Sequence, residues 1–326
     1  MKRTIVVNLV LVLALVVPVA PLLPDCGAAA EKFPTKPISN VVGVSAGAGV
    51  DLRARTLSKQ AEAALKVAVA VENRTGASSA VAFNYLKRQP ADGYTVMTEN
   101  SESLALIVAN PEVQAQLSDI KFIIGVSKQP SFFIVRSNSP FKTLEDLIKY
   151  AKENPGKIKV GGTGATGVHS QAMRLWSKQV GIEMMWVPFE GGNQNVAAIV
   201  GGHVDAVQMN AHVTKQYIQD GTLRPLANTG SVRDSFWPDV PTFKEKGVNL
   251  ELYSQTTVVV RKDTPADRLK VLHDAFKQAM ETKTFQDNLK ALSAEPSYMS
   301  GEDLDKLFPT LVEQSRAELK ATGVIK

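Results

Sequence analysis

The sequence predicts an α/β protein with two lobes, each built around its own sheet, and three observations support this fold class. Strand-like apolar runs alternate with helical patterns along the whole chain, which is typical of β-α-β units with a mostly parallel sheet. This alternation begins afresh near residue 157, so two sheets are expected. About 300 residues follow an N-terminal leader, which is long enough for two lobes.

The first 30 residues have the features of a secretory signal peptide. Lys2 and Arg3 precede an apolar run from Ile5 to Ala20, and an Ala-Ala-Ala stretch ending at Ala30 provides an A-x-A cleavage site. The run is too short and too interrupted by proline to span a membrane. We expect cleavage after Ala30 and export of the remaining chain.

Cysteine content and charge exclude several function classes. The only cysteine, Cys26, precedes the expected cleavage point, and lipid anchoring there is not expected because Pro24 and Asp25 stand where lipidation sites require small residues. Once Cys26 is removed with the leader, the exported chain is expected to have no disulfide, thiolate nucleophile or cysteine-based metal site. The net charge of +5 is dispersed, without the basic runs of nucleic-acid binders, and mildly favours an anionic small molecule.

The first lobe is expected from three strand and helix pairs together with the end of the chain. The strands are ISNVVGV (38–44), AVAVEN (68–73) and GYTVMTEN (93–100), and helical patterns follow at 51–65, 79–89 and around 103–117. A long strand, LYSQTTVVVRK (252–262), precedes a helical remainder over 265–326 that returns to this lobe. We place the first lobe at residues 31–128 plus 252–326.

The second lobe is expected over residues 129–251. Its strands include KIKV (157–160), MMWVPF (184–189), VDAVQM (204–209) and LRPLANTG (223–230), with helices after the first two. Two crossings of the chain then join the lobes.

The loop Gly43-Val44-Ser45-Ala46-Gly47 matches G-x-S-x-G, the turn that carries the nucleophile of α/β-hydrolases. A secreted serine hydrolase, with Ser45 as nucleophile and His169 as base, is therefore an alternative function. The context disfavours it, because the loop follows the first strand, whereas that fold needs earlier strands and an oxyanion loop before its serine.

The same loop can instead be an anion site at a helix start. A glycine-rich turn leads directly into the helix from Asp51, and exposed N–H groups at a helix start carry about half a positive charge. Asp51 is expected to cap this helix and to pair with Arg55. The expected ligand contacts here are Ser45, Ala46, Gly47, Ala48, Gly49 and Val50.

A second glycine loop contains G-x-G-x-x-G at Gly162, Gly164 and Gly167, between a strand and a helix. This pattern is typical of dinucleotide binding, with Glu190 near the place of a ribose-binding acid. An exported chain meets no such cofactor, and Glu190 directly precedes two glycines, so we expect no cofactor and no metal. The loop is instead expected to bind the same anion through Thr163, Gly164, Ala165, Thr166 and His169.

Side chains after other strands are expected to complete the pocket, because ligands of α/β proteins bind at the carboxyl ends of strands. They are Asn100, Ser101, Phe189 and Asn210.

Several stretches, in order and nearly end to end, carry a resemblance to a known family. They include SAGAGVDLRART from Ser45, PADGYTV from Pro90, SPFKTLEDLIKYAKENPGKIKVGGTG from Ser139, VPFEGG from Val187 and WPDVPTFKEKG from Trp237. With these stretches the chain resembles the solute-binding receptors of the tripartite tricarboxylate transporter family, of the Bordetella uptake receptor type.

The resemblance implies a two-lobed periplasmic binding protein of type II-like form, with two Rossmann-like domains joined by two hinge crossings. It implies a periplasmic receptor that catalyses nothing and delivers a small organic acid to an integral membrane permease. We expect a monomer by default, and the dispersed charge predicts no binding of nucleic acid. In that family, backbone groups and water from the two glycine loops hold the ligand carboxylate.

The chain departs from the family pattern at two places. Val50 replaces the threonine of the usual P-x-A-G-G-G-T-D loop, and Glu190 stands where the family often has lysine. If Glu190 faces the cleft, it repels a distal anionic group, which disfavours a plain dicarboxylate and leaves an amino acid, an aromatic acid or a cation-bearing ligand open. The alternative is that Glu190 points to solvent and does not restrict the ligand.

Overall fold

The structure of the chain is a computed structural model, and it describes residues 32–77, 79–109, 116–165, 167–189, 191–321, 323 and 325. The expected signal peptide with Cys26, and the expected site residues Thr166 and Glu190, lie outside the described residues. From Phe33 onward the chain packs as one compact unit. No helix in the described ranges is long and apolar enough to cross a bilayer.

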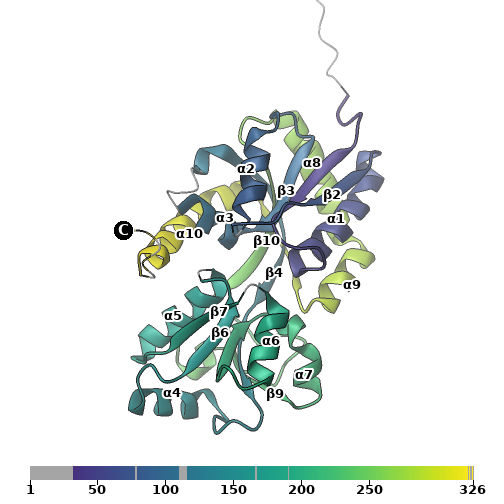
Figure 1. Ribbon diagram of the computed structural model, residues 1–326. Coiled ribbons are helices and arrows are strands. Elements are labelled where there is room, and N and C mark those ends of the chain that lie inside the picture. The colour runs from purple at the N-terminus through teal and green to yellow at the C-terminus, as the bar shows by residue number, and fades with distance from the viewer. Residues whose placement is uncertain are drawn as a thin grey trace, which may run out of the picture. The chain divides into compact units, whose positions relative to one another are not determined.

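The first of two sheets has six strands in the order β11-β4-β10-β3-β1-β2 (Figure 1). The pairs β1–β2 and β1–β3 are parallel, whereas β10 pairs antiparallel with both β3 and β4, and β11 pairs antiparallel with β4. The strands are β1 (Ile38–Val42), β2 (Val69–Asn73), β3 (Thr95–Asn100), β4 (Ile120–Pro130), β10 (Tyr253–Arg261) and β11 (Glu295–Ser300).

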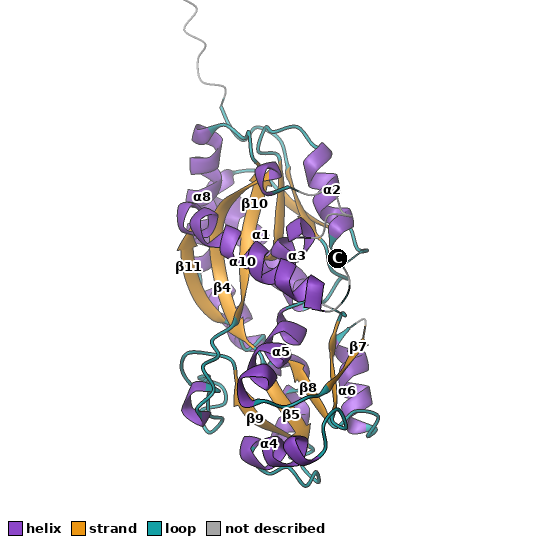
Figure 2. Cartoon of the chain, turned by 90° about the vertical axis from the view of Figure 1, so that its left-hand side faces the viewer, coloured by secondary structure: helices purple, strands orange, loops and turns teal. Residues whose placement is uncertain are grey.

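Helices cover both faces of this sheet, because its strands bury apolar side chains alternately on either side. On β10, Val258 and Val260 belong to one core, and Val259 belongs to the other. The first core packs against α1 (Gly49–Leu65), α8 (Ala266–Glu281) and α9 (Lys283–Ala291). The second packs against α2 (Ala80–Arg88), α3 (Ser101–Ala109) and α10 (Gly301–Ala321), and Figure 2 shows α10 beside α3. The short 3-10 helix Leu117–Asp119 precedes β4.

The second sheet has five strands in the order β7-β6-β8-β5-β9. The pairs β6–β7 and β6–β8 are parallel, and β5 pairs antiparallel with β8 and β9. The strands are β5 (Phe132–Arg136), β6 (Lys159–Thr163), β7 (Met185–Phe189), β8 (Ala206–Met209) and β9 (Leu223–Asn228).

Two cores also flank this second sheet. One is centred on the fully buried Trp176 and involves α4 (Leu144–Glu153) and α5 (Val168–Val180). The other involves α6 (Gly192–Val200), α7 (Lys215–Gln219) and the 3-10 helix η3 (Ala211–Val213). A further 3-10 helix, Lys244–Lys246, lies between β9 and β10. A capping box of Thr143 with Asp146 fixes the start of α4.

The structure confirms the α/β fold class with two sheets and corrects two expectations about them. The sheets are mixed rather than mostly parallel, because β4, β5 and β10 run against their neighbours. The segment 265–326 is not entirely helical, since β11 (Glu295–Ser300) pairs with the long strand β4. This edge strand is short and contains Pro296, which an edge position tolerates because one side of the strand needs no donor.

The chain passes between the sheets twice, and the two passages are hydrogen-bonded to each other. Ser131 alone separates β4 from β5, and residues 229–252 connect β9 to β10. The Ser131 amide donates to the Thr229 hydroxyl (3.0 Å), and the Thr229 amide donates to the Ser131 carbonyl (2.9 Å). The Leu252 amide donates to the Thr229 carbonyl (2.9 Å), so all three segments are joined at one place.

Candidate functional site

The start of α1, after the carboxyl end of β1, offers backbone donors without a side-chain acceptor. The residue before the helix is Ala48, which provides no capping side chain. Gly47 adopts the left-handed region, with a φ of 82°, which a glycine takes without steric cost. Because the first N–H groups of a helix have no intrahelical partner, this end is suited to an anion.

Asp51 fixes the shape of this loop instead of facing a ligand. Its carboxylate accepts hydrogen bonds from the Gly47 amide (2.8 Å), Arg55 (3.0 Å) and Asn73 (2.8 Å). Burial alone would raise the pKa of Asp51, but these three hydrogen bonds outweigh burial and lower it. The predicted pairing with Arg55 is confirmed.

The second glycine loop, before α5, is held by the strands beside it. The Gly164 amide donates to the Phe189 carbonyl (2.9 Å), and the Trp186 indole donates to the Gly164 carbonyl (2.9 Å). A β-carbon at Gly162 would lie 1.9 Å from the Trp186 ring, so packing alone requires glycine there. The residue before this helix is Gly167, with a φ of 138°, which has no side chain of its own to cap the helix.

Groups that belong to the two sheets meet between these two helix starts. The His212 ring, in η3 after β8, lies 3.5 Å from the place that a β-carbon on Gly49 would occupy. Leu106 on α3 lies 3.9 Å from the corresponding point at Gly167. The start of α1 therefore touches a residue that follows a strand of the second sheet. The start of α5 lies near a residue of α3, a helix that covers the first sheet.

Two histidines between the loops are held by amides and stay neutral at pH 7. Burial lowers the pKa of His169 to about 4, and burial, followed by the nearby Arg53 charge and His169, lowers the pKa of His212 to about 4. The His212 Nδ1 atom accepts from the Gln129 amide (3.1 Å), which leaves Nε2–H as a donor on the Gly49 side.

His169 is oriented differently from the donor role that its position suggested. Its Nε2–H donates to the Asn210 carbonyl oxygen (3.2 Å), and the Asn210 amide in turn donates to the Pro130 carbonyl (3.1 Å). The remaining ring nitrogen of His169 is an acceptor. His212, which sequence reasoning did not select, supplies the free ring donor.

The other expected site residues have varied surroundings. Ser45, Ala46, Gly47 and Ala165 are exposed, whereas Ala48, Gly49, Thr163 and Gly164 are half-buried, and Val50 is buried. The Thr163 hydroxyl accepts from Asn195 (3.3 Å), and the Asn100 carbonyl oxygen accepts from the Thr256 hydroxyl (3.1 Å). Ser101 is buried and donates to Glu102, and Phe189 packs against the core of the second sheet.

Arg53 and Gln129 also escaped sequence reasoning. Arg53 is 3% exposed, and its Nη1 atom lies 3.5 Å from the projected β-carbon of Gly49, on α1. Gln129, at the end of β4, accepts from Arg53 over 3.4 Å and donates to His212. Sequence held a signal for Arg53, because position 53 lies on the apolar face of α1 that Val50 and Leu57 define.

The hydrolase alternative lacks a triad among the described residues. His169 and His212 bond to the amides of Asn210 and Gln129 instead of a carboxylate, and no hydrogen bond joins the Ser45 hydroxyl to a histidine in that part of the chain. A nucleophilic serine needs a histidine oriented by an acid. The described residues also contain no group of histidine, cysteine and acidic side chains suited to a metal ion.

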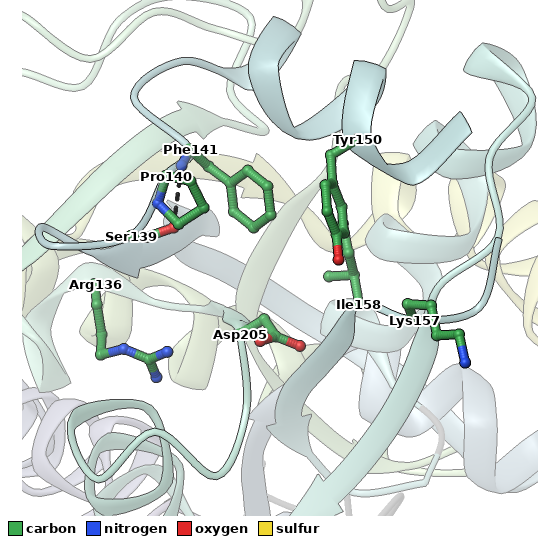
Figure 3. Close-up of a pocket in the computed structure, with 8 residues that line it drawn as sticks. All are labelled: Arg136, Ser139, Pro140, Phe141, Tyr150, Lys157, Ile158 and Asp205. Atoms are coloured by element: carbon green, nitrogen blue, oxygen red, sulfur yellow. Dashed lines mark hydrogen bonds between the residues drawn. The ribbon is translucent and has the colours of Figure 1, made fainter. Parts of the chain in front are cut away.

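A separate pocket lies at the opposite end of the second sheet, before β6 and β8 (Figure 3). Figure 3 shows Arg136, Asp205 and Tyr150 among its lining residues. Asp205 accepts from the Lys159 amide (2.8 Å), and Arg136 donates to the Ile199 and Val204 carbonyls (2.9 Å each). These charged groups brace strand starts and the end of α6, so the pocket has a structural explanation.

The fold is that of periplasmic solute-binding proteins: the solved "Structure of a periplasmic transporter" has a TM-score of 0.79 and 25% identity, covering 89% of this chain and 98% of that one. Residues 53–324 match the family model described as "Tripartite tricarboxylate transporter family receptor". The chain belongs to this family, as its sequence resemblance predicted.

Relatives and solved structures agree with this assignment. The chain is 31% identical to the "UPF0065 protein in gbd 5'region" of Cupriavidus necator, over 92% of this chain and 91% of that protein. It is 25% identical to the protein BugT of Bordetella pertussis, over 90% and 91% of the two chains.

Two solved structures from Rhodopseudomonas palustris share the fold. Rpa4515, solved with adipate, has a TM-score of 0.78 and 24% identity, covering 90% of this chain and 99% of that one. MatC, solved with malate, has a TM-score of 0.77 and 21% identity, covering 87% and 99%.

Proposed function

We propose that this receptor binds a small organic acid between the start of α1 and the start of α5. The observation that carries the proposal is that His212, after β8, touches the first residue of α1, while His169 near the start of α5 lies close enough to lower the pKa of His212. Each helix start contributes about half a positive charge, so that two together match one carboxylate. The free Nε2–H of His212 adds a side-chain donor beside the first loop.

The proposed binding residues combine the two loops with the side chains that lie between them. From the first loop they are the backbone groups of residues 45–50, except the Gly47 and Ala48 amides, which bond to Asp51 and to the Ser45 carbonyl. From the second loop they are those of residues 163–166 with His169, except the amide and carbonyl of Gly164, which bond to Phe189 and Trp186. Asn210 positions His169, and His212 joins the set. Asn100, Ser101 and Phe189 remain proposed as more distant contacts at the ends of β3 and β7.

We further propose that ligand capture closes two lobes, residues 31–128 with 252–326 and residues 129–251. The passage at Ser131, Thr229 and Leu252 is the proposed hinge, because the two connections that the described chain makes between the sheets are hydrogen-bonded to each other there. Hinges of this kind concentrate backbone rotation in a few residues at element ends.

Delivery to a membrane permease and export through cleavage after Ala30 complete the proposal. The family is one of transporter receptors, and the related structures hold malate and adipate, which support a carboxylate as cargo. The receptor is proposed to act as a monomer and to catalyse no reaction on its ligand.

A binding screen tests the proposal. Malate, adipate, benzoate, aspartate and leucine amide, a cation without a carboxylate, are added in turn, and unfolding is followed by Trp fluorescence. A ligand at a concentration of 100 times its Kd stabilises the folded state by about 2.7 kcal/mol. At least one carboxylate should therefore raise the melting temperature, and leucine amide should not. A protein that no carboxylate stabilises would contradict the proposal.

The hydrolase alternative is tested by Ser45→Ala. A receptor keeps carboxylate binding in this variant, within about threefold in Kd, because the loop contributes mainly backbone groups. Turnover of a p-nitrophenyl ester by the wild type that disappears in Ser45→Ala would support the hydrolase instead.

A further inference from the structure

Arg53 is a buried cation without an ion-pair partner among the described residues. It is 3% exposed, and its Nε atom has no hydrogen-bond partner in that part of the chain. Its one hydrogen bond, from Nη1 to the Gln129 carbonyl oxygen, is long at 3.4 Å. Burial of a guanidinium group without a paired anion costs several kcal/mol, a cost that a bound anion beside it would offset.

Arg53 is charged, and the one acid that acts on it, Glu99, does so without a hydrogen bond or ion pair to it among the described residues. Burial lowers the pKa of Arg53 to about 10, which still leaves it protonated at pH 7. Glu99 is the acid that acts on it, but burial raises the pKa of Glu99 and opposes its ionisation. The Glu99 carboxylate instead accepts from the Ser79 hydroxyl (2.7 Å) and the Asn100 amide (2.8 Å).

Arg53 lies beside the proposed ligand site and faces β4, the strand from which the chain passes to the second sheet. Its Nη1 atom and the His212 ring both lie 3.5 Å from the projected β-carbon of Gly49, the first residue of α1. Gln129 connects the two, because its carbonyl oxygen faces Arg53 and its amide faces His212. The guanidinium group is thus held next to the helix start, on the side of β4.

The charges of this region exceed what one carboxylate balances. The two helix starts together match a single negative charge, and the two histidines are neutral at pH 7. Arg53 adds a positive charge that Glu99 opposes only from a distance, because the Glu99 oxygens bond to Ser79 and Asn100 instead. We propose that Arg53 is a specificity-determining residue that pairs with a second acidic group of the ligand, so that the receptor selects a dicarboxylate over a monocarboxylate.

This inference rests on the proposed carboxylate-binding function. Matched pairs of ligands test the role of Arg53 separately from that function. The probes are succinate, glutarate and adipate, each compared by calorimetry with its own monoamide, which keeps the length but has one negative charge fewer. A hydrogen bond between charged groups is expected to favour the diacid of fitting length by about 10- to 100-fold in Kd.

Arg53→Met is the decisive variant, and Lys59→Met is its control, because Lys59 is an exposed cation on the same helix. In Arg53→Met the diacid should bind within about threefold of its monoamide, whose own Kd should change little. Lys59→Met should retain the wild-type preference. Without ligand, Arg53→Met should melt at a higher temperature than the wild type, because it removes an unpaired buried charge.

Three results would overturn the proposal. The first is an unchanged preference for the diacid in Arg53→Met. The second is a failure of both Arg53→Met and Arg53→Gln to fold, which would assign Arg53 a structural role. The third is equal binding of diacid and monoamide by the wild type, which leaves the carboxylate receptor intact but removes the role of Arg53. A wild type that binds none of these probes counts with the third result, because it removes the preference for a diacid, while the screen with malate, benzoate and aspartate decides the receptor function separately.

Discussion

The ring of His212 lies 3.5 Å from the point where a β-carbon on Gly49 would be, so a residue after β8 touches the first residue of α1. The two residues are far apart in sequence and belong to the surroundings of different sheets. Because Gly49 has no side chain, the ring can approach the backbone donors of the helix start. This relationship brings a ring N–H and free main-chain amides to the same place.

The histidines should remain neutral well below pH 6. Their pKa values of about 4 lie below the ordinary 6.5, so the unfolded chain takes up protons first as the pH falls. Folding stability should therefore decrease between about pH 6.5 and pH 4. NMR titration of the ring protons checks both histidines, and a pKa near 6.5 for either ring would contradict the account of its burial.

Arg53→Met should raise the pKa of His212 and leave that of His169 unchanged. The Arg53 charge is one of the causes that lower the pKa of His212, whereas His169 is affected by burial and by its bond to Asn210. The same NMR titration measures this difference. Equal shifts of both rings would indicate a general rearrangement instead of a lost charge.

Asp51→Asn should weaken carboxylate binding by about 10-fold, because a neutral amide cannot accept from Gly47, Arg55 and Asn73 as a carboxylate does. The loop before α1 would lose its shape without losing any backbone donor. Calorimetry with the tightest-binding diacid measures the effect. Glu62→Gln is the control, since Glu62 pairs with Lys59 on the same helix away from the loop.

Gly162→Ala should destabilise the protein by about 2 kcal/mol or more, because the added carbon would overlap the Trp186 ring at 1.9 Å. Gly191→Ala is the matched control, since nothing lies within 4 Å of its projected β-carbon. Urea unfolding compares the two. A Gly162→Ala protein as stable as Gly191→Ala would show that Trp186 does not fix the second loop.

Thr229→Val should cost about 1 to 3 kcal/mol of stability, because it leaves the buried Ser131 amide without its hydroxyl acceptor. If the passage is the hinge, the rate of ligand binding in stopped-flow fluorescence should change as well. Thr282→Val, which removes the hydroxyl that caps α9 away from the passage, serves as a control for a lost hydroxyl. Identical binding rates in wild type and Thr229→Val would contradict the hinge assignment.

Local patterns in the sequence predicted the features that depend on near neighbours. The alternation of strands and helices predicted two sheets, and the spacing of Asp51 and Arg55 predicted their ion pair. The strand β11 escaped prediction because it lies at an edge and contains Pro296. Its pairing with β4 is visible only once the long strand is in place.

In the candidate site, too, the sequence predicted what depends on near neighbours and missed what depends on distant segments. Both glycine loops were predicted from the helices that follow them, but Gly162 owes its lack of a side chain to Trp186 on the next strand. Arg53, Gln129 and His212 come from three separated segments, and their proximity depends on how the two sheets meet. No spacing rule in one sequence relates such residues.

The most direct measurement follows the amide signals of both helix starts by NMR while a diacid is added. The account predicts that the Gly49 and Val50 amides and the Val168 and His169 amides shift together, with one common Kd, as one ligand contacts both loops. Saturable binding that shifts only one of these pairs, or neither, would contradict the claim that a single carboxylate lies between the two helices.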